Sequence, residues 1–257
     1  MLWDPPHLDA PFHPAASAPP CQLTEVLEKA GARATALLSN LQNFSAEEEI
    51  EFQTLDRAEA VLSLGSESFE YVVAFGPHGP PPAVQEYRKP IHGSSGDAAG
   101  IDIGLPEMAM IFLPVMQGDY EMECEGEGAW KSAPAWVVRF QQRKDRPVRT
   151  FAFRVGKEVH PEGLKGRAWI DAASGEILHM ETGIMEGLVA LHVRNWFLSI
   201  DYGPVQFQSS PVKVWLPQSV DGYYDFGLKR TIIYHTFSKF LLFSVQSRET
   251  LGKPKAP

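Results

Sequence analysis

Histidine and carboxylate side chains are the first candidates for chemistry in this chain. The eight histidines are scattered and form no His-Glu-x-x-His pair of the kind that binds zinc from a helix. His179 and Glu181 are two residues apart, which puts them on one face of a strand, where they could bind a metal or exchange a proton. We expect them instead to form a solvent-facing pair. Asp97, Asp102 and Glu107 offer oxygen ligands, but their spacing matches no calcium-binding loop, so the sequence predicts no metal site and no cofactor.

Motifs for nucleophilic catalysis and for phosphate binding are incomplete. Residues 93–96 are Gly-Ser-Ser-Gly, which lacks the Gly-x-Ser-x-Gly spacing of a nucleophile elbow. Trp130 stands where a phosphate-binding loop has glycine before its lysine, here Lys131. Asp171 and Glu176 flank a tight turn, where polar residues are expected in any case. The sequence therefore predicts no catalytic residue and a non-enzymatic protein, with an undetected hydrolase or metal enzyme as an alternative.

Composition limits the partners of the protein. The chain has 257 residues, of which 44% are hydrophobic and 21% charged, and its formal net charge is -9. Nucleic-acid binding requires clustered Lys and Arg to neutralise phosphates, so we expect no nucleic-acid partner. No stretch reaches the roughly 18 consecutive apolar residues of a membrane-spanning helix, so we expect no transmembrane segment.

The N-terminal residues are rich in proline and contain one of the two cysteines. Residues 1–21 lack the basic start and apolar centre of a signal peptide, and we expect a disordered leader or linker there, with a flexible tail over residues 248–257. Cys21 and Cys124 could form a disulfide bond in an exported protein, whereas in the cytosol both would more often be buried free thiols. The sequence leaves this choice open.

Two helices are predicted. Leu, Val and Ala recur at steps of three and four residues from Leu23 to Leu41, while Glu25, Glu28 and Arg33 fall between them, which indicates an amphipathic helix of about five to six turns. A short apolar helix is predicted over residues 108–113, which are nearly all apolar. Pro106 suits the first turn of this helix, and Pro114 is expected to end it.

Most of the remaining chain is predicted to form β-strands. The clearest signal is residues 163–181, in which Trp169 and Ile170 precede a tight Ala-Ser-Gly turn and Ile177 and Met180 follow it. Successive strands without crossover helices pair antiparallel, so one long sheet is expected. The predicted strands cover residues 49–54, 69–75, 83–88, 120–125, 135–142, 148–155, 167–171, 176–185, 195–202, 212–217 and 231–245, the last with a bend near Lys239.

The order of these elements and three short motifs resemble the periplasmic lipoprotein-carrier superfamily, the LolA/LolB-like fold. The motifs are Trp169-Ile170-Asp171 with Ser174-Gly175, Asp201-Tyr202 with Phe207, and Trp215-Leu216-Pro217. Within that superfamily the chain most resembles secreted proteins of soil acidobacteria. The resemblance covers residues 22–247 and implies one α+β domain: a long curved antiparallel sheet, or half-barrel, with both helices on its concave face. It also implies a periplasmic or secreted location.

The same resemblance implies a function. In carriers of this kind, an apolar cavity between sheet and helices holds acyl chains, and each buried CH₂ contributes about 0.8 kcal/mol. We expect a lipid or other apolar small molecule to bind in the hollow of the sheet. The alternative is a protein-interaction or envelope-sensing module of the same fold, with its core filled by side chains. For either function we expect a monomer. The residues expected to line the ligand site are Met108, Met110, Ile111, Phe112, Trp136, Trp169, Met180 and Trp215.

Overall fold

The computed structural model describes residues 5, 7–14, 20–40, 43–76, 84–92, 108–155, 157–207 and 213–243. Several residues named above lie outside the described part of the chain: the Gly-Ser-Ser-Gly segment at 93–96, Asp97, Asp102, Glu107, the expected helix start at 106 and the tail at 248–257. The helices are α1 (Leu23–Asn40), η2 (Ala109–Phe112), α3 (Pro114–Gln117) and η3 (Val189–Leu191). The strands are β1 (Asn43–Leu55), β2 (Val61–Phe75), β3 (Val84–Pro90), β4 (Tyr120–Trp130), β5 (Ala133–Gln142), β6 (Ala152–Val155), β7 (Glu158–Pro161), β8 (Leu164–Asp171), β9 (Ile177–Ile184), β10 (Val193–Gln206), β11 (Lys213–Phe226) and β12 (Lys229–Leu242).

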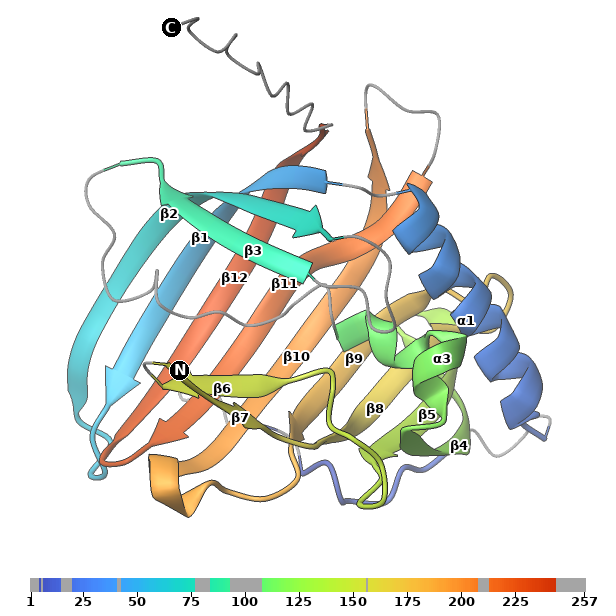
Figure 1. Ribbon diagram of the computed structural model, residues 1–257, viewed down its shortest axis with the longest axis horizontal. Coiled ribbons are helices and arrows are strands. Elements are labelled where there is room, and N and C mark those ends of the chain that lie inside the picture. Colours follow the sequence, from blue (N-terminus) through green and yellow to red (C-terminus); the bar gives the residue numbers. More distant parts are fainter. Residues whose placement is uncertain are drawn as a thin grey trace, which may run out of the picture.

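Ten of these strands form a single antiparallel sheet that curves strongly and does not close (Figure 1). Their order is β3-β2-β1-β12-β11-β10-β9-β8-β5-β4, so β3 and β4 form the two edges. The helices α1, η2 and α3 lie over the concave face at the β8–β10 side, and the small β6–β7 ribbon lies in front of β10–β12 (Figure 1). The prediction of an α+β fold with a curved antiparallel sheet and helices on its concave face is confirmed.

Alternation of side chains explains how the strands form the core. In β10 the buried residues Trp196, Leu198, Ile200 and Tyr202 all belong to the core under α1 and η2. Residues that alternate in this way lie on one face of a strand, so a single pleated face contributes them. The core extends from α1 across the hollow to β1 and β2, and side chains therefore fill most of the concave side.

Packing of α1 against η2 depends on close backbone approach. A Cβ atom on Gly31 would lie 3.2 Å from the carbonyl oxygen of Phe112, tighter than an ordinary contact. Gln117 reinforces this contact, since its side-chain nitrogen donates to the carbonyl oxygens of Leu27 at 3.0 Å and Phe112 at 2.8 Å. The first half of α1 is thus fixed to the helices beneath it.

Several element predictions need correction. The apolar helix is a short 3₁₀ helix, and Pro114 begins a second helix, α3, rather than ending the first, because proline suits a first helical position. The strand predicted over 148–155 forms only at β6, and it pairs with β7, which was not predicted, outside the main sheet. The bend near Lys239 is confirmed, since this residue has φ of 52°.

Described residues from the proline-rich N-terminal segment make defined contacts on the convex face. Leu8 is 9% exposed, and Lys165 donates to the Asp9 carboxylate at 2.6 Å. Arg167 donates to the carbonyl oxygen of Ala10, and Phe12 packs on the cluster around Trp169. Residues 7–14, which were expected to belong to a disordered leader, therefore lie along β8 and its neighbours.

Candidate functional site

The structure does not bring the eight predicted ligand-binding residues together on one open surface. Met108, Ile111, Phe112 and Met180 are buried in the main core, and Met110 is buried in a satellite cluster with Ala34, Leu113 and Met116. Trp169 lies on the opposite, convex face with Ala135 and Val137. Only Trp136 and Trp215 are half-buried and line clefts. Most of the predicted residues therefore support the fold, and the open space lies beside them.

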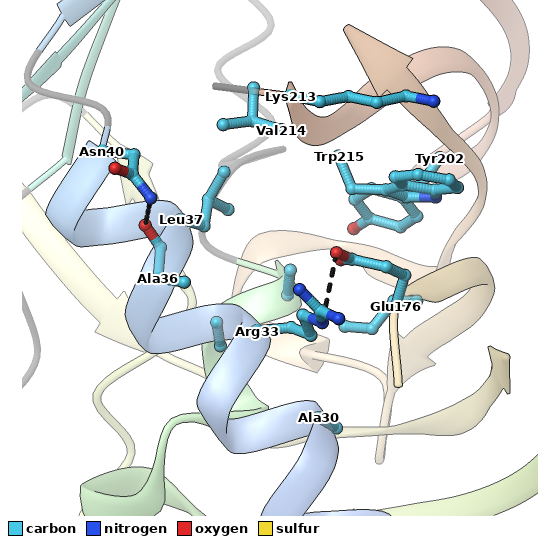
Figure 2. Close-up of a pocket in the computed structure, with 13 residues that line it drawn as sticks. Ala30, Arg33, Ala36, Leu37, Asn40, Glu176, Tyr202, Lys213, Val214 and Trp215 are labelled. Atoms are coloured by element: carbon cyan, nitrogen blue, oxygen red, sulfur yellow. Dashed lines mark hydrogen bonds and ion pairs between the residues drawn. The ribbon is translucent and has the colours of Figure 1, made fainter. Parts of the chain in front are cut away.

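One cleft opens between the second half of α1 and the ends of β10 and β11 (Figure 2). Its volume is about 190 Å³. Small and apolar side chains form much of its lining, and polar groups flank them. The lining residues are Ala30, Arg33, Ala34, Ala36, Leu37, Asn40, Ala109, Glu176, Ile177, Tyr202, Lys213, Val214 and Trp215.

The charged groups of this cleft come from α1, from the turn before β9 and from the start of β11. Arg33 of α1 donates from Nε to the carbonyl oxygen of Ser174 at 2.8 Å, and the same atom lies 3.4 Å from Oε1 of Glu176. Burial raises the pKa of Glu176, although Arg33 opposes that shift. Lys213 Nζ lies 5.7 Å from the centre of the Trp215 ring. The cleft therefore combines an apolar wall with charged groups at its rim, an arrangement suited to an amphiphilic molecule.

A second cleft, of about 130 Å³, lies at the other end of α1. It is lined by Trp136 and Ile170 from the sheet and by Val26 and Lys29 from the helix. Trp136 and Trp215 therefore line separate clefts, at opposite ends of α1.

Charged side chains also lie deep in the concave core. Arg88 donates from Nε and Nη2 to the two carboxylate oxygens of Glu48, at 2.6 and 3.1 Å, and His235 Nδ1 lies 2.8 Å from the same carboxylate. The side chains of Glu48 and His235 are 0% exposed. Arg88 also stacks over the Tyr71 ring at 5.0 Å. We call these four residues the Glu48 cluster, and no sequence motif identified it.

Electrostatics within the Glu48 cluster follow from burial and pairing. Burial alone would raise the pKa of Glu48, but hydrogen bonds from His235 and Arg88 outweigh it and lower that pKa. Burial lowers the pKa of His235 despite the neighbouring carboxylate. The expected state is an ionised Glu48 and Arg88 beside a neutral imidazole.

The prediction of a solvent-facing pair at His179 and Glu181 is wrong. His179 is 1% exposed on the convex face, with Nδ1 2.7 Å from the carboxylate of Asp201 and Nε2 3.8 Å from that of Glu181. Trp130 stacks on its ring with centroids 3.5 Å apart. Lys131 donates to the other oxygen of Asp201 at 2.6 Å. Burial would lower the pKa of His179, but the two carboxylates outweigh burial and raise it.

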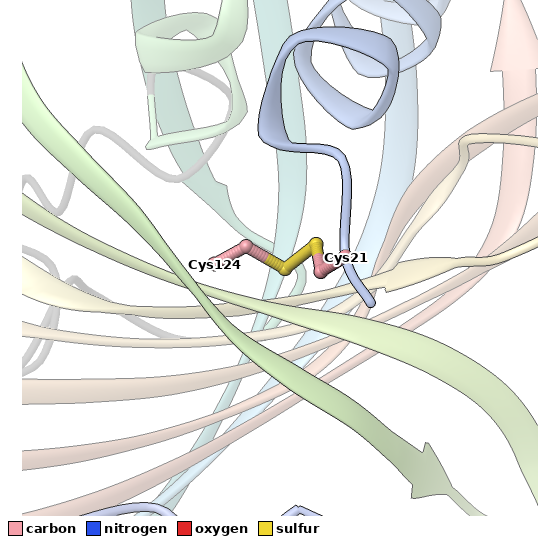
Figure 3. Close-up of a disulfide and its surroundings, with 2 residues drawn as sticks. All are labelled: Cys21 and Cys124. Atoms are coloured by element: carbon pink, nitrogen blue, oxygen red, sulfur yellow. A yellow bond between two sulfur atoms is a disulfide. The ribbon is translucent and has the colours of Figure 1, made fainter. Parts of the chain in front are cut away.

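Cys21 and Cys124 are joined in a disulfide bond (Figure 3). The bond connects Cys21, two residues before α1, to the edge strand β4, and its Cα atoms are 6.2 Å apart. It resolves the choice that the sequence left open.

Two features are absent from the described residues. They contain no group of three or more His, Cys, Asp or Glu side chains placed to hold a metal ion. None of their helices is both long and apolar enough to cross a membrane.

Similarity of this chain to known proteins is found among solved structures. No family model matches the chain. No curated protein matches it either. Among solved structures, a DUF1329 family protein from Desulfovibrio piger ATCC 29098 has a TM-score of 0.47 and 11% identity, over 87% of this chain and 94% of its own. A putative outer membrane lipoprotein-sorting protein domain from Vibrio parahaemolyticus has a TM-score of 0.43 and 10% identity, over 91% of this chain and 96% of its own.

Proposed function

We propose that this protein binds an apolar or amphiphilic small molecule, such as a lipid, in the cleft between α1 and β10–β11, and that it acts without catalysis. The observation that carries the proposal is the cleft itself, with Leu37, Val214 and Trp215 on its walls. Elsewhere in the hollow, buried side chains form a continuous core. An apolar chain would gain about 0.8 kcal/mol for each CH₂ removed from water.

The size of the cleft limits the bound part of the ligand. Its volume of about 190 Å³ is below the roughly 300–1,000 Å³ of drug-sized ligand sites. A longer ligand therefore requires movement of the second half of α1. This half is the less firmly held one, because the four buried residues of α1, Val26, Ala30, Gly31 and Ala34, all precede Thr35.

We further propose an exported, periplasmic or secreted protein. The disulfide bond between Cys21 and Cys124 supports this location, because such bonds persist in oxidising compartments and are rare in the cytosol.

Calorimetric titration with decanol tests the binding proposal. Ala36→Trp places a large ring in the cleft and should weaken decanol binding at least tenfold. Ala32→Trp is the matched control, since Ala32 is exposed on the same helix and does not line the cleft. Saturable binding to the native chain and to A32W, with loss in A36W, supports the proposal. Absence of saturable binding to the native chain would contradict it and favour the interaction module with a filled core.

A further inference from the structure

Two hydrogen-bonding atoms of residues that line the α1 cleft have no partner among the residues that the structure describes. The Tyr202 hydroxyl and the Trp215 Nε1 are buried, and neither has a hydrogen-bond partner within the described part of the chain. Tyr202 is 9% exposed, and burial raises the pKa of its hydroxyl well above the ordinary value. Its hydroxyl points towards the space beside Glu176 (Figure 2).

Buried polar atoms without partners are uncommon because each costs about 1–3 kcal/mol. Trp Nε1 is a donor only, and a tyrosine hydroxyl donates readily, so both atoms are suited to an acceptor. Both residues line one cleft, so a ligand oxygen group that reaches both atoms would satisfy them.

Charge at the cleft favours a negative ligand. Arg33 and Glu176 form an ion pair at 3.4 Å, so their charges largely cancel. Lys213, in contrast, has no ion pair among the residues that the structure describes, and it lies over the Trp215 ring. The cleft lining therefore carries one uncompensated positive charge, next to a donor that has no acceptor.

Resting on the binding function proposed above, we propose that the ligand is an amphiphile whose polar end is an anionic oxygen group, a carboxylate or a phosphate. This group accepts hydrogen bonds from Tyr202 and Trp215 and faces the ammonium group of Lys213. The apolar chain lies against Leu37 of α1 and Val214 of β11. A neutral alcohol can satisfy the donors but gains nothing from Lys213, and a cationic amphiphile is repelled by it.

Four probes with the same ten-carbon chain separate head group from chain: decanoate, decyl phosphate, decanol and decyltrimethylammonium. Each is titrated into the native, disulfide-bonded protein by calorimetry at about pH 8, where carboxylates are ionised. One or both anionic probes should bind about tenfold more tightly than decanol, in line with hydrogen bonds to a charged acceptor. The cationic probe should bind most weakly. The tighter of the two anionic probes identifies the head group as carboxylate or phosphate.

Single substitutions assign the contacts. Tyr202→Phe removes only the hydroxyl, and Lys213→Met removes only the charge while keeping an apolar stem, so each should weaken anion binding about fivefold to tenfold. Lys213→Met should not change decanol binding more than twofold, and Tyr202→Phe should weaken decanol binding less than it weakens anion binding, because a hydrogen bond to a neutral acceptor contributes less. Lys89→Met is the control, because Lys89 is an exposed lysine on the distant edge strand β3.

The outcomes distinguish the two proposals. If decanol binds as tightly as both anions, or if Tyr202→Phe and Lys213→Met leave anion binding unchanged, the head-group assignment is overturned and the apolar-ligand function stands. If none of the four probes binds, both proposals fail. Thermal melting of each variant confirms that it is folded, and Tyr202→Phe keeps the buried ring that the core requires.

Discussion

At the scale of single residues, the most unusual feature is the Glu48 cluster. Ionised side chains are rarely buried unless they are paired and hydrogen-bonded, because leaving water costs several kcal/mol for each ion. Arg88 and His235 satisfy both carboxylate oxygens of Glu48, and Tyr71 provides an aromatic face for the guanidinium. The cluster joins β1, β2, β3 and β12 across the concave face.

Removal of the buried arginine should destabilise the protein strongly. Arg88→Met leaves Glu48 without its cation, and the free energy of unfolding should fall by about 3–5 kcal/mol. Lys89→Met, next to it on β3, removes an exposed pair with Glu70 and should cost less than about 1 kcal/mol. Urea denaturation of both variants measures the difference. If both substitutions lower the free energy of unfolding equally, the buried Arg88–Glu48 pair has no special role in stability.

A second residue-scale prediction concerns pH and His179. Asp201 and Glu181 raise the pKa of His179, so the stability it contributes is fully present below the unfolded pKa of about 6.5 and is lost as the pH rises through the folded value. Lys131 and Asp221 also face this site through Asp201. The destabilisation caused by His179→Gln should therefore be larger at about pH 5.5 than at about pH 8.5.

Urea melts at the two pH values measure this difference. Asp201→Asn removes the nearer carboxylate partner, so in that background the effect of His179→Gln should depend much less on pH. If His179→Gln lowers the free energy of unfolding by the same amount at both pH values, the assignment of a charged, paired histidine is contradicted.

The sequence contained part of the information about these clusters. Glu48 has the same alternation as Ile50 and Phe52, so it falls on the face that points into the core, and His235 alternates in the same way with Ile233 and Phe237. A charged residue in an inward position is a detectable signal. The identity of its partner cannot be detected in the sequence, because Glu48 and His235 are 187 residues apart and only the β1–β12 register brings them together.

At the scale of elements, the disulfide bond fixes the start of α1 to β4, whereas the second half of the helix borders the open cleft. The cross-link closes a loop with a sequence separation of 103 residues. A cross-link that closes a long loop lowers the entropy of the unfolded chain and so stabilises the folded state. Removal of the bond should therefore lower the free energy of unfolding.

The double variant Cys21→Ser/Cys124→Ser should lower the free energy of unfolding by about 2–4 kcal/mol. Urea melts of this variant should coincide with those of the native chain under reducing conditions, since both lack the bond. The double variant serves as its own control, because a reductant should not change its melt. A native chain that is insensitive to reductant would contradict a stabilising bond.

Element predictions succeeded where one periodicity ran through a long segment and failed where short segments depended on distant contacts. The helical spacing from Leu23 to Leu41 and the alternation in β10 identified both elements. The ribbon of β6 and β7 was not distinguished from the main sheet, because Phe151 and Phe153 pack on Trp196 and Phe226, contacts that no local pattern encodes. The cleft was missed for a similar reason, since Arg33, Tyr202 and Lys213 converge from three separate elements.

At the scale of the whole molecule, the sheet order joins the two ends of the chain. β1 pairs with β12 as well as with β2, so the first three strands attach to the rest of the sheet through the last one. The β10, β11 and β12 strands each have a neighbour on both sides. At the β3 edge the pairing is incomplete, since β3 covers only the part of β2 from Phe69 to Phe75.

This order predicts uneven stability along a single strand. Residues 61–67 of β2 pair with β1 on one side, and within the described residues no strand pairs with their other side. Leu64 in this segment is 76% exposed, so little burial opposes its opening. Hydrogen exchange measured by mass spectrometry should therefore be at least a hundredfold faster in peptides covering 61–67 than in those covering β11.

Residues 69–75 provide the control, because they continue the same strand but have β3 as a second neighbour. Their exchange should be slower than that of residues 61–67. Equal protection of the two halves at low protein concentration would mean that another part of the chain covers the edge. Protection that appears only at high concentration would indicate a second copy pairing there, because an uncovered strand edge is a template for added strands.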